Sequence, residues 1–226
     1  MNYSYEGVHL FDIPSLVPDF NLKKINENIK YIGFVFNSIQ SSIEKKIFDL
    51  AKKIGYACFT FENLNSNQIC ANLAYNLNQI GEFVCIWTND PLLFQVAGPR
   101  INIFFQREND LYDFKKIEEK FGIEPWKLPD LFSFIGFEEK KAGGVIGIEK
   151  EKVLKWLKFF SSAEEMVFRL DLLELVEDEK TFHYQNLIKK QEEKILNNLR
   201  LLKLEPNFLI SIKKENFSIK KKAKVI

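Results

Sequence analysis

The fold of this chain is decided by LYDFKKIEEKFGIEPWKLPDLFSFIGF, residues 111–137, followed by GGVIGIEKEKVLKWLKFF, residues 143–160. Apolar residues recur there at helical spacing, and Gly and Pro separate the segments. The pattern predicts helices over residues 114–121, 128–135, 150–160 and 164–176, and a further amphipathic stretch over 184–202. We therefore expect a helical subdomain over residues 110–212, followed by a basic, mobile tail over 213–226.

Before residue 110, short apolar runs rich in β-branched and aromatic residues alternate with amphipathic helical stretches. The runs are residues 8–11, 31–36, 57–61, 83–87 and 101–105, and the clearest helices are 43–54 and 67–80. Such alternation favours an α/β core over residues 1–109, with a mostly parallel central sheet flanked by helices. Ligands of such sheets lie beyond the carboxyl ends of the strands, so the positions of interest directly follow the runs. They include Asp12, Asn37 and residues 88–90.

Composition narrows the class of protein further. The chain has 226 residues and 32 Lys and Arg against 31 Asp and Glu, so it lacks the basic surplus typical of a general nucleic-acid coat protein. Its three cysteines form no C-x-x-C pair and lie in apolar stretches, which is typical of reduced core residues. No signal pattern and no apolar run of bilayer-spanning length is present, so we expect a cytoplasmic protein without a membrane partner.

The stretch quoted first resembles the helix-three-turn-helix region of the 5′-nuclease family, which includes the 5′-3′ exonuclease domain of bacterial DNA polymerase I and the flap endonucleases. The match follows the order of a Tyr-Asp helix start, a Phe-Gly-Ile turn, a Pro-Asp helix and a Gly-Val-x-Gly-Ile hairpin. Four upstream segments resemble the family's strand ends and a helix start: VHLFDIPSL (8–16), KYIGFVFNS (30–38), FENLNSNQICANLA (61–74) and FVCIWTNDPLLFQV (83–96). The resemblance implies a PIN-like nuclease core with an appended helical subdomain.

The resemblance also implies a cluster of carboxylates that holds divalent ions about 4 Å apart for phosphodiester cleavage. Of the family's acidic positions, Asp12 and Asp90 are retained. The degenerate positions are Asn37, Asn65, Asn67, Gln68, Leu92, Phe137 and Lys140. Neutral amides cannot offset the repulsion between two dications, so we expect no cofactor, or Mg²⁺ or Mn²⁺ at Asp12 and Asp90 if the protein is active. The structural alternative is that both aspartates cap the turn or helix that follows, an arrangement that Pro91 favours for Asp90.

The DNA-binding parts implied by the resemblance are altered as well. The family hairpin presents backbone amides to duplex phosphates, and here its candidate contacts are Gly144, Gly147, Lys150, Lys152 and Lys155. Glu149 and Glu151 stand where the family has a glycine and a lysine, and these anions oppose phosphate binding. The alternative is that the glycines serve only the fold. The family's long basic arch is also missing, because only residues 38–42 separate Asn37 from the next predicted helix.

Three functions are compatible with this sequence. The first is a catalytically inactive pseudonuclease that binds duplex or branched DNA weakly, or a DNA polymerase or repair protein, in replication and repair. The second is a minimal Mg²⁺- or Mn²⁺-dependent 5′-3′ exonuclease that uses Asp12, Asp90 and Glu62 with the substrate phosphate. The third is a purely protein-binding structural domain. Residue chemistry favours the first, because seven of the nine family positions have no carboxylate.

Overall fold

A computed structural model describes residues 6–17, 19–22, 25–37, 41–177, 180–205 and 212–219 of the chain. The chain forms two compact units: a sheet unit of residues 1–115 and 204–226, and a helical unit of residues 116–203. The sequence placed the boundaries after residues 109 and 212. The difference at the first boundary arises because a strand over residues 110–112 pairs with the sheet.

The sheet unit is built on one six-stranded sheet in the order β3-β2-β1-β4-β5-β6. Its strands are β1 (Val8–Asp12), β2 (Tyr31–Val35), β3 (Ala57–Phe59), β4 (Val84–Thr88), β5 (Ile101–Phe105) and β6 (Asp110–Tyr112). The neighbours from β3 to β5 pair in parallel, and β6 pairs antiparallel with β5. The predicted α/β fold with a mostly parallel sheet is confirmed. The strand order reverses between β1 and β4, which is where ligands of such sheets bind.

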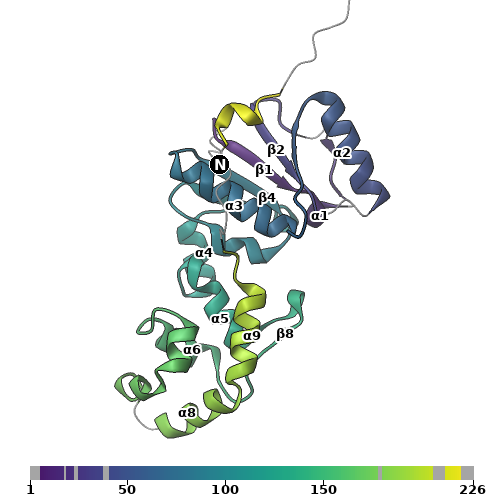
Figure 1. Ribbon diagram of the computed structural model, residues 1–226. Helices are drawn as coiled ribbons and strands as arrows, with labels where there is room; N and C mark the ends of the chain where they lie inside the picture. The colour runs from purple at the N-terminus through teal and green to yellow at the C-terminus, as the bar shows by residue number, and fades with distance from the viewer. Residues whose placement is uncertain are drawn as a thin grey trace, which may run out of the picture. The chain divides into compact units, whose positions relative to one another are not determined.

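Helices cover both faces of this sheet (Figure 1). They are α1 (Ile13–Leu16), α2 (Ser42–Ile54), α3 (Ser66–Gln79) and the 3-10 helices η2 (Pro91–Val96) and η3 (Gln106–Glu108). The two long helices begin with capping boxes: Ser41 with Glu44 before α2, and Asn65 with Gln68 before α3. α1 was not predicted, because a single turn is too short to show a helical period.

An aromatic-rich core lies on one face of the sheet. The buried cluster contains Phe11 of β1, Phe34 of β2 and Phe36 directly after β2, with Ile13 and Leu16 from α1. Ring pairs such as Phe11–Phe34, with centroids 5.4 Å apart, connect neighbouring strands. Burial of these large apolar side chains provides the main driving force for folding of the sheet unit.

Residues 214–218 pack on the sheet, although the sequence predicted a mobile tail over residues 213–226, of which 220–226 lie outside the described residues. The 3-10 helix η7 (Lys214–Phe217) places Phe217 in a fully buried position, and Ser218 pairs with Tyr31 at a β-bridge. Gly33 makes this possible, since a Cβ at Gly33 would lie 2.9 Å from the Phe217 ring. Hydrophobic burial of one ring thus holds a segment whose lysines suggested solvent exposure.

The helical unit is formed by short helices between residues 116 and 203. They are α4 (Phe114–Phe121), which starts at the unit boundary, η4 (Pro125–Lys127), α5 (Leu128–Ile135), η5 (Glu138–Lys140), α6 (Lys150–Leu157), α7 (Ala163–Phe168), η6 (Leu170–Leu175), α8 (Thr181–Lys190) and α9 (Glu192–Leu202). A two-stranded ribbon of β7 (Gly136–Phe137) and β8 (Ala142–Gly143) follows α5. The helices expected over 164–176 and 184–202 are each broken, at Arg169 and Gln191. In the described part of the chain, no helix is long and apolar enough to cross a bilayer.

The packing of Phe217 on Gly33 can be tested by a double-mutant cycle. Phe217→Ala should lower the free energy of unfolding of the sheet unit by about 3 kcal/mol, because it leaves a cavity in a well-packed site. Gly33→Ala should also destabilise the wild-type protein, since its methyl group meets the ring, but it should cost much less in the Phe217→Ala background. Urea unfolding measures all four proteins. Additive effects of the two substitutions would contradict the contact.

Candidate functional site

A buried carboxylate lies at the carboxyl end of the central strands. Asp12 ends β1, its side chain is fully buried, and Thr88 at the end of β4 donates a hydrogen bond from Oγ1 to Asp12 Oδ2 over 2.8 Å. Asp12 Oδ1 accepts no hydrogen bond from the described residues. Although Asp12 immediately precedes α1, its side chain does not cap that helix. The capping role considered for Asp12 is therefore wrong.

The environment of Asp12 disfavours its charged form. Burial raises the pKa of the Asp12 carboxyl, and the nearby hydroxyl groups of Ser66, Ser15 and Thr88 offset only part of this effect. The negative charge of Asp90 raises the pKa further. Ionisation of this buried group therefore costs free energy in the folded protein.

Asp90 is fully engaged in local hydrogen bonds. Its Oδ1 accepts from the backbone N–H of Leu92 over 2.9 Å and caps η2, which is the role that Pro91 favoured. Its Oδ2 accepts from Asn67 Nδ2 over 2.7 Å, and its own N–H donates to Thr88 Oγ1. Both carboxylate oxygens therefore already have protein donors, and a metal ion would compete with them.

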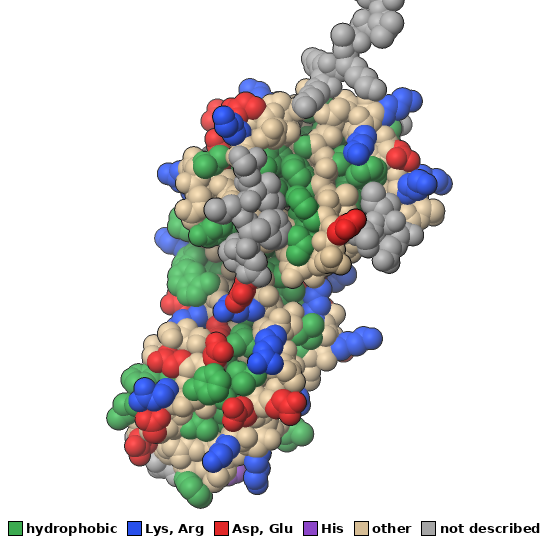
Figure 2. All heavy atoms as spheres, viewed as in Figure 1, with side chains coloured by type: hydrophobic (Ala, Val, Ile, Leu, Met, Phe, Trp, Pro, Cys, Tyr) green, Lys and Arg blue, Asp and Glu red, His purple; other side chains and the backbone are tan. Residues whose placement is uncertain are grey.

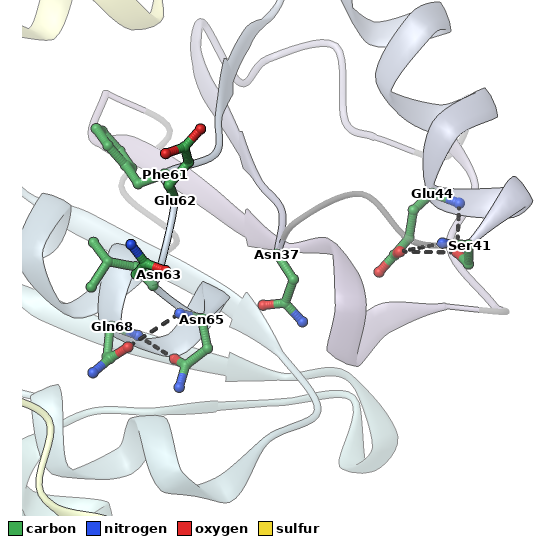
Figure 3. A pocket seen from close by; sticks show the side chains of 9 residues that line it. Asn37, Ser41, Glu44, Phe61, Glu62, Asn63, Asn65 and Gln68 are labelled. Atoms are coloured by element: carbon green, nitrogen blue, oxygen red, sulfur yellow. Dashed lines mark hydrogen bonds between the residues drawn. The ribbon is translucent and has the colours of Figure 1, made fainter.

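Three amides, Asn37, Asn65 and Gln68, meet at the same edge of the sheet, around the start of α3 (Figure 3). Asn65 Oδ1 accepts from the N–H of Gln68 over 2.9 Å, and Gln68 Oε1 accepts from the N–H of Asn65 over 3.1 Å. Asn37, which follows β2, accepts from the N–H of Ser66 through Oδ1 over 2.6 Å. These side chains now satisfy the backbone N–H groups that every helix start leaves without a partner.

An open cavity of about 900 Å³ borders these amides. Asn37, Asn65 and Gln68 line it together with Glu44 and Glu62, whereas Asp12 and Asp90 do not. The carboxylate of Glu44 already accepts from Ser41 in the capping box of α2 (Figure 3). Across the described ranges, no three His, Cys, Asp or Glu side chains form a group that could hold a metal ion. The donor set does not fit two divalent ions.

Three further candidate positions, Leu92, Phe137 and Lys140, lie elsewhere in the structure. Leu92 is buried in η2, next to the Asp90 cap. Phe137 and Lys140 belong to the helical unit. Phe137 is buried and stacks on Phe132 with ring centroids 4.7 Å apart, and Lys140 lies half-buried at the end of η5. Two of these three positions therefore serve hydrophobic cores, where no carboxylate is needed.

The glycine-rich segment of residues 143–149 forms a non-helical turn before α6, with Gly147 at a φ of 88°. Gly144 packs so closely that an added Cβ would lie 2.5 Å from the carbonyl oxygen of Ile135. Three side chains, one at the N-cap of α9 and two within the helix, form hydrogen bonds with the backbone of this turn. Gln191 bonds both N–H and C=O of Ile146, Lys194 donates to Gly144 O, and Asn198 donates to Gly143 O.

The three candidate lysines of α6 differ in their surroundings. Lys152 Nζ lies 2.6 Å from Oε1 of Glu177, whose side chain is only 5% exposed. Burial alone would raise the pKa of Glu177, but hydrogen bonds from Lys152 and Trp156 outweigh it and hold that pKa below its usual range. Lys155 lies at the edge of the same pair, 4.0 Å from Glu177 Oε2. Lys152 therefore already has an acidic partner within the fold, and its role as a DNA contact stays a prediction.

Some residues of the site were missed from the sequence. Ser15 Oγ shares a hydrogen bond with Thr88 Oγ1 and accepts from the N–H of Asn89, so it joins α1 to the end of β4. Position 88 was recognisable, because polar residues directly follow an apolar strand there. Ser15 and Glu177 gave no comparable signal, since their partners are distant in sequence.

Comparison with known proteins supports the family resemblance, although no protein-family model matches the sequence. A 5′-3′ exonuclease of Buchnera aphidicola subsp. Acyrthosiphon pisum is 23% identical over 223 residues, covering 89% of this chain and 78% of the relative. A second, from Buchnera aphidicola subsp. Baizongia pistaciae, is 29% identical over 171 residues and covers 74% of this chain. The chain spans only 56% of that relative and 61% of another from Buchnera aphidicola subsp. Schizaphis graminum.

Solved structures share the fold. A mutant of the bacteriophage T5 5′-exonuclease superimposes with a TM-score of 0.72 at 15% identity, over 87% of both chains. A T5 flap endonuclease in a pseudo-enzyme-product complex with DNA and metal ions gives a TM-score of 0.67 at 13% identity, over 87% of this chain and 89% of the other. Related T5 5′-exonuclease structures hold divalent metal ions.

Structure and sequence point to the same resemblance. The sheet is mostly parallel with a polar carboxyl edge, a glycine-rich turn precedes α6, and the sequence is similar to 5′-3′ exonucleases over most of its length. The chain is similar to 5′-3′ exonucleases in sequence, and it has the fold of the T5 5′-exonuclease.

Proposed function

We propose that this 5′-3′ exonuclease-like protein is a pseudonuclease, which binds duplex or branched DNA weakly and does not cleave it. The observation that carries the proposal is the use of its former metal-binding positions. Asn37, Asn65 and Gln68 bond backbone N–H groups at the start of α3, and Asn67 donates to Asp90. These contacts stabilise the fold and leave few groups free for a cation.

Charge counting supports the proposal. Two divalent ions carry four positive charges, whereas Asp12 and Asp90 supply at most two negative charges. The buried carboxyl of Asp12 resists ionisation, and both oxygens of Asp90 are occupied. Closely spaced dications need several anionic ligands. The short connection of residues 38–42, in place of the family arch, also leaves no gate for threading a 5′ single strand.

The proposed DNA affinity is weak because the relevant cations are few. Lys152 pairs with Glu177, and Glu149 and Glu151 place anions beside the glycine-rich turn. On the face shown in Figure 2, basic and acidic side chains are interspersed over the helical unit. A surface of mixed charge gives little of the counterion release that drives binding to DNA. The proposed function includes binding to a DNA polymerase or a repair protein.

One observation favours a second candidate, a minimal exonuclease with a single Mg²⁺ or Mn²⁺. Asp12 Oδ1 is buried and accepts no hydrogen bond from the described residues, so it is an available oxygen ligand. One ion can be held by one or two carboxylates together with a substrate phosphate. The following measurements separate the two candidates.

We expect no cleavage of flapped, nicked or single-stranded DNA in Mg²⁺ or Mn²⁺ above the level of the Asp12→Ala, Asp90→Ala double variant. The reason is the missing carboxylate charge around the site. Labelled oligonucleotides separated on denaturing gels provide the measurement. Cleavage that requires both aspartates would replace the pseudonuclease proposal with the single-ion exonuclease.

Asp12→Asn should stabilise the protein at neutral pH. The folded-state pKa of Asp12 is raised, so the folded protein holds this proton more tightly than the unfolded chain. The stabilisation from this proton is complete below the unfolded value near 3.8 and is lost as the pH rises through the folded value. The advantage of Asn, which cannot ionise, should therefore grow with pH and vanish at low pH in urea unfolding.

Asp90→Asn is the matched control and should destabilise the protein by about 1–2 kcal/mol. An amide there can accept through only one atom, and it loses a bond from Leu92 or Asn67. If Mn²⁺ raises the unfolding midpoint of the wild type but of neither variant, an ion binds at these aspartates. That result would support the single-ion candidate.

The double change Glu149→Gly, Glu151→Lys should strengthen duplex binding several-fold without creating cleavage, because it removes two anions and adds a cation. The salt dependence of wild-type binding should have a log–log slope of only about −2, since about 0.9 is expected for each phosphate contact and Lys152 is engaged elsewhere. Fluorescence anisotropy over a salt series measures both quantities. An unchanged affinity would favour the purely protein-binding alternative.

Two lysine variants serve as controls for this experiment. Lys150→Ala should weaken DNA binding and leave the unfolding midpoint unchanged. Lys152→Ala should lower the unfolding midpoint, because it leaves Glu177 with fewer partners. Equal losses of stability would show that Lys150 also has a structural role.

A further inference from the structure

Four aromatic side chains form a continuous row across the sheet, on adjacent strands. Phe34 of β2 pairs in register with Phe11 of β1, Phe11 with Trp87 of β4, and Trp87 with Phe104 of β5. The ring centroids of Phe11 and Trp87 lie 5.2 Å apart, and those of Trp87 and Phe104 lie 4.1 Å apart. His9 accepts a hydrogen bond from Trp87 Nε1 over 3.0 Å, which fixes the indole orientation.

A cavity of about 320 Å³ opens over part of this row. Phe11, Trp87 and Phe104 form its apolar lining, and Phe20 closes one side. This volume is at the lower end of the range for small-molecule pockets, which begins at roughly 300 Å³. An aromatic surface of this kind favours a flat ligand, because offset stacking brings two π-faces into full contact.

The cavity lies on the opposite side of the sheet from the polar cluster. Phe11 directly precedes Asp12 in β1, and Trp87 directly precedes Thr88 in β4. Successive side chains of a strand point to opposite faces, so the aromatic lining and the Asp12–Thr88 pair face away from each other. The cavity is therefore a separate site from the degenerate nuclease site.

The rim of the cavity is rich in primary amides, which include Gln106 and Asn109 from the turn after β5 and Asn21 and Asn26 from the segment before β2. Each amide offers both a donor and an acceptor. The side chains of Gln106 and Asn109 form no hydrogen bond with other described residues, so they are available to a ligand. Asp19 is the only charged residue of the described lining, which disfavours an anionic group inside the cavity.

We propose that this cavity binds one uncharged nucleobase, stacked on Trp87 with its polar edge toward Gln106 and Asn109. A nucleobase is planar, neutral and carries donors and acceptors along one edge, as this lining requires. The base comes either from a free nucleoside or from an unpaired position of a nucleic-acid strand, with its phosphates outside the cavity. This site does not depend on the proposed pseudonuclease function.

The test uses 2-aminopurine riboside, whose fluorescence is quenched when the base stacks on an aromatic ring. We expect saturable quenching by the full-length protein. Gln106→Ala and Asn109→Ala should each weaken binding about three- to tenfold, which is the loss of one hydrogen bond. Trp87→Phe should reduce the quenching while keeping an aromatic side chain. The control Gln79→Ala changes an exposed amide at the end of α3 and should have no effect.

Two further arms identify the ligand class. An oligonucleotide with a single unpaired 2-aminopurine shows whether a strand-borne base binds, and a free nucleoside shows whether the base alone suffices. Saturable binding in either arm supports the site when the Gln106 and Asn109 variants weaken it. Toluene, which is flat but has no hydrogen-bonding edge, serves as a competitor that tests whether the cavity binds any flat apolar molecule. The proposal is overturned if neither probe binds saturably, or if toluene competes fully and both rim variants bind 2-aminopurine riboside as the wild type does.

Discussion

The hydrogen bond from Thr88 to Asp12 joins the two strands between which the sheet order reverses, and the candidate site depends on it. The Thr88 hydroxyl also accepts from the N–H of Asp90, and Asp90 in turn accepts from Asn67 at the start of α3. One hydroxyl thus links β1, β4 and, through Asp90, the helix that follows β3. Because Asp12 is fully buried, this link operates where water does not compete and where an unpaired charge is costly.

This network explains why amides suit the edge of the sheet. A carboxylate at position 67 would face Asp90 without a donor, and two adjacent carboxylates repel each other unless a cation lies between them. Asn67 instead donates its N–H group to Asp90, while Asn37 and Asn65 accept from the backbone of α3. An amide keeps the shape of the acid and adds a donor, so the edge becomes stable without metal ions. A cation bound at these residues would have to displace the same contacts.

Much of the fold followed from the sequence, and the reasons are local. Alternating apolar runs predicted β1 to β5, and polar residues after those runs predicted Asp12, Asn37 and Asp90 at one edge. Contacts between distant parts of the chain gave no such signal. The seating of Phe217 on Gly33 and the Lys152–Glu177 pair both depend on which surfaces meet after folding. The lysines near both contacts suggested solvent exposure. In the structure, the buried Phe217 ring holds the first segment, and Glu177 pairs with Lys152 in the second.

Because side chains alternate along β1 and β4, the aromatic face and the polar face of the sheet are set by different residues. Phe11 and Trp87 belong to the hydrophobic core and its edge, so the sheet needs them regardless of what happens at Asp12 and Thr88. Loss of carboxylates on one face changes charge but not the packing of the other, because each strand keeps its register. The aromatic lining therefore does not depend on which side chains occupy the polar face.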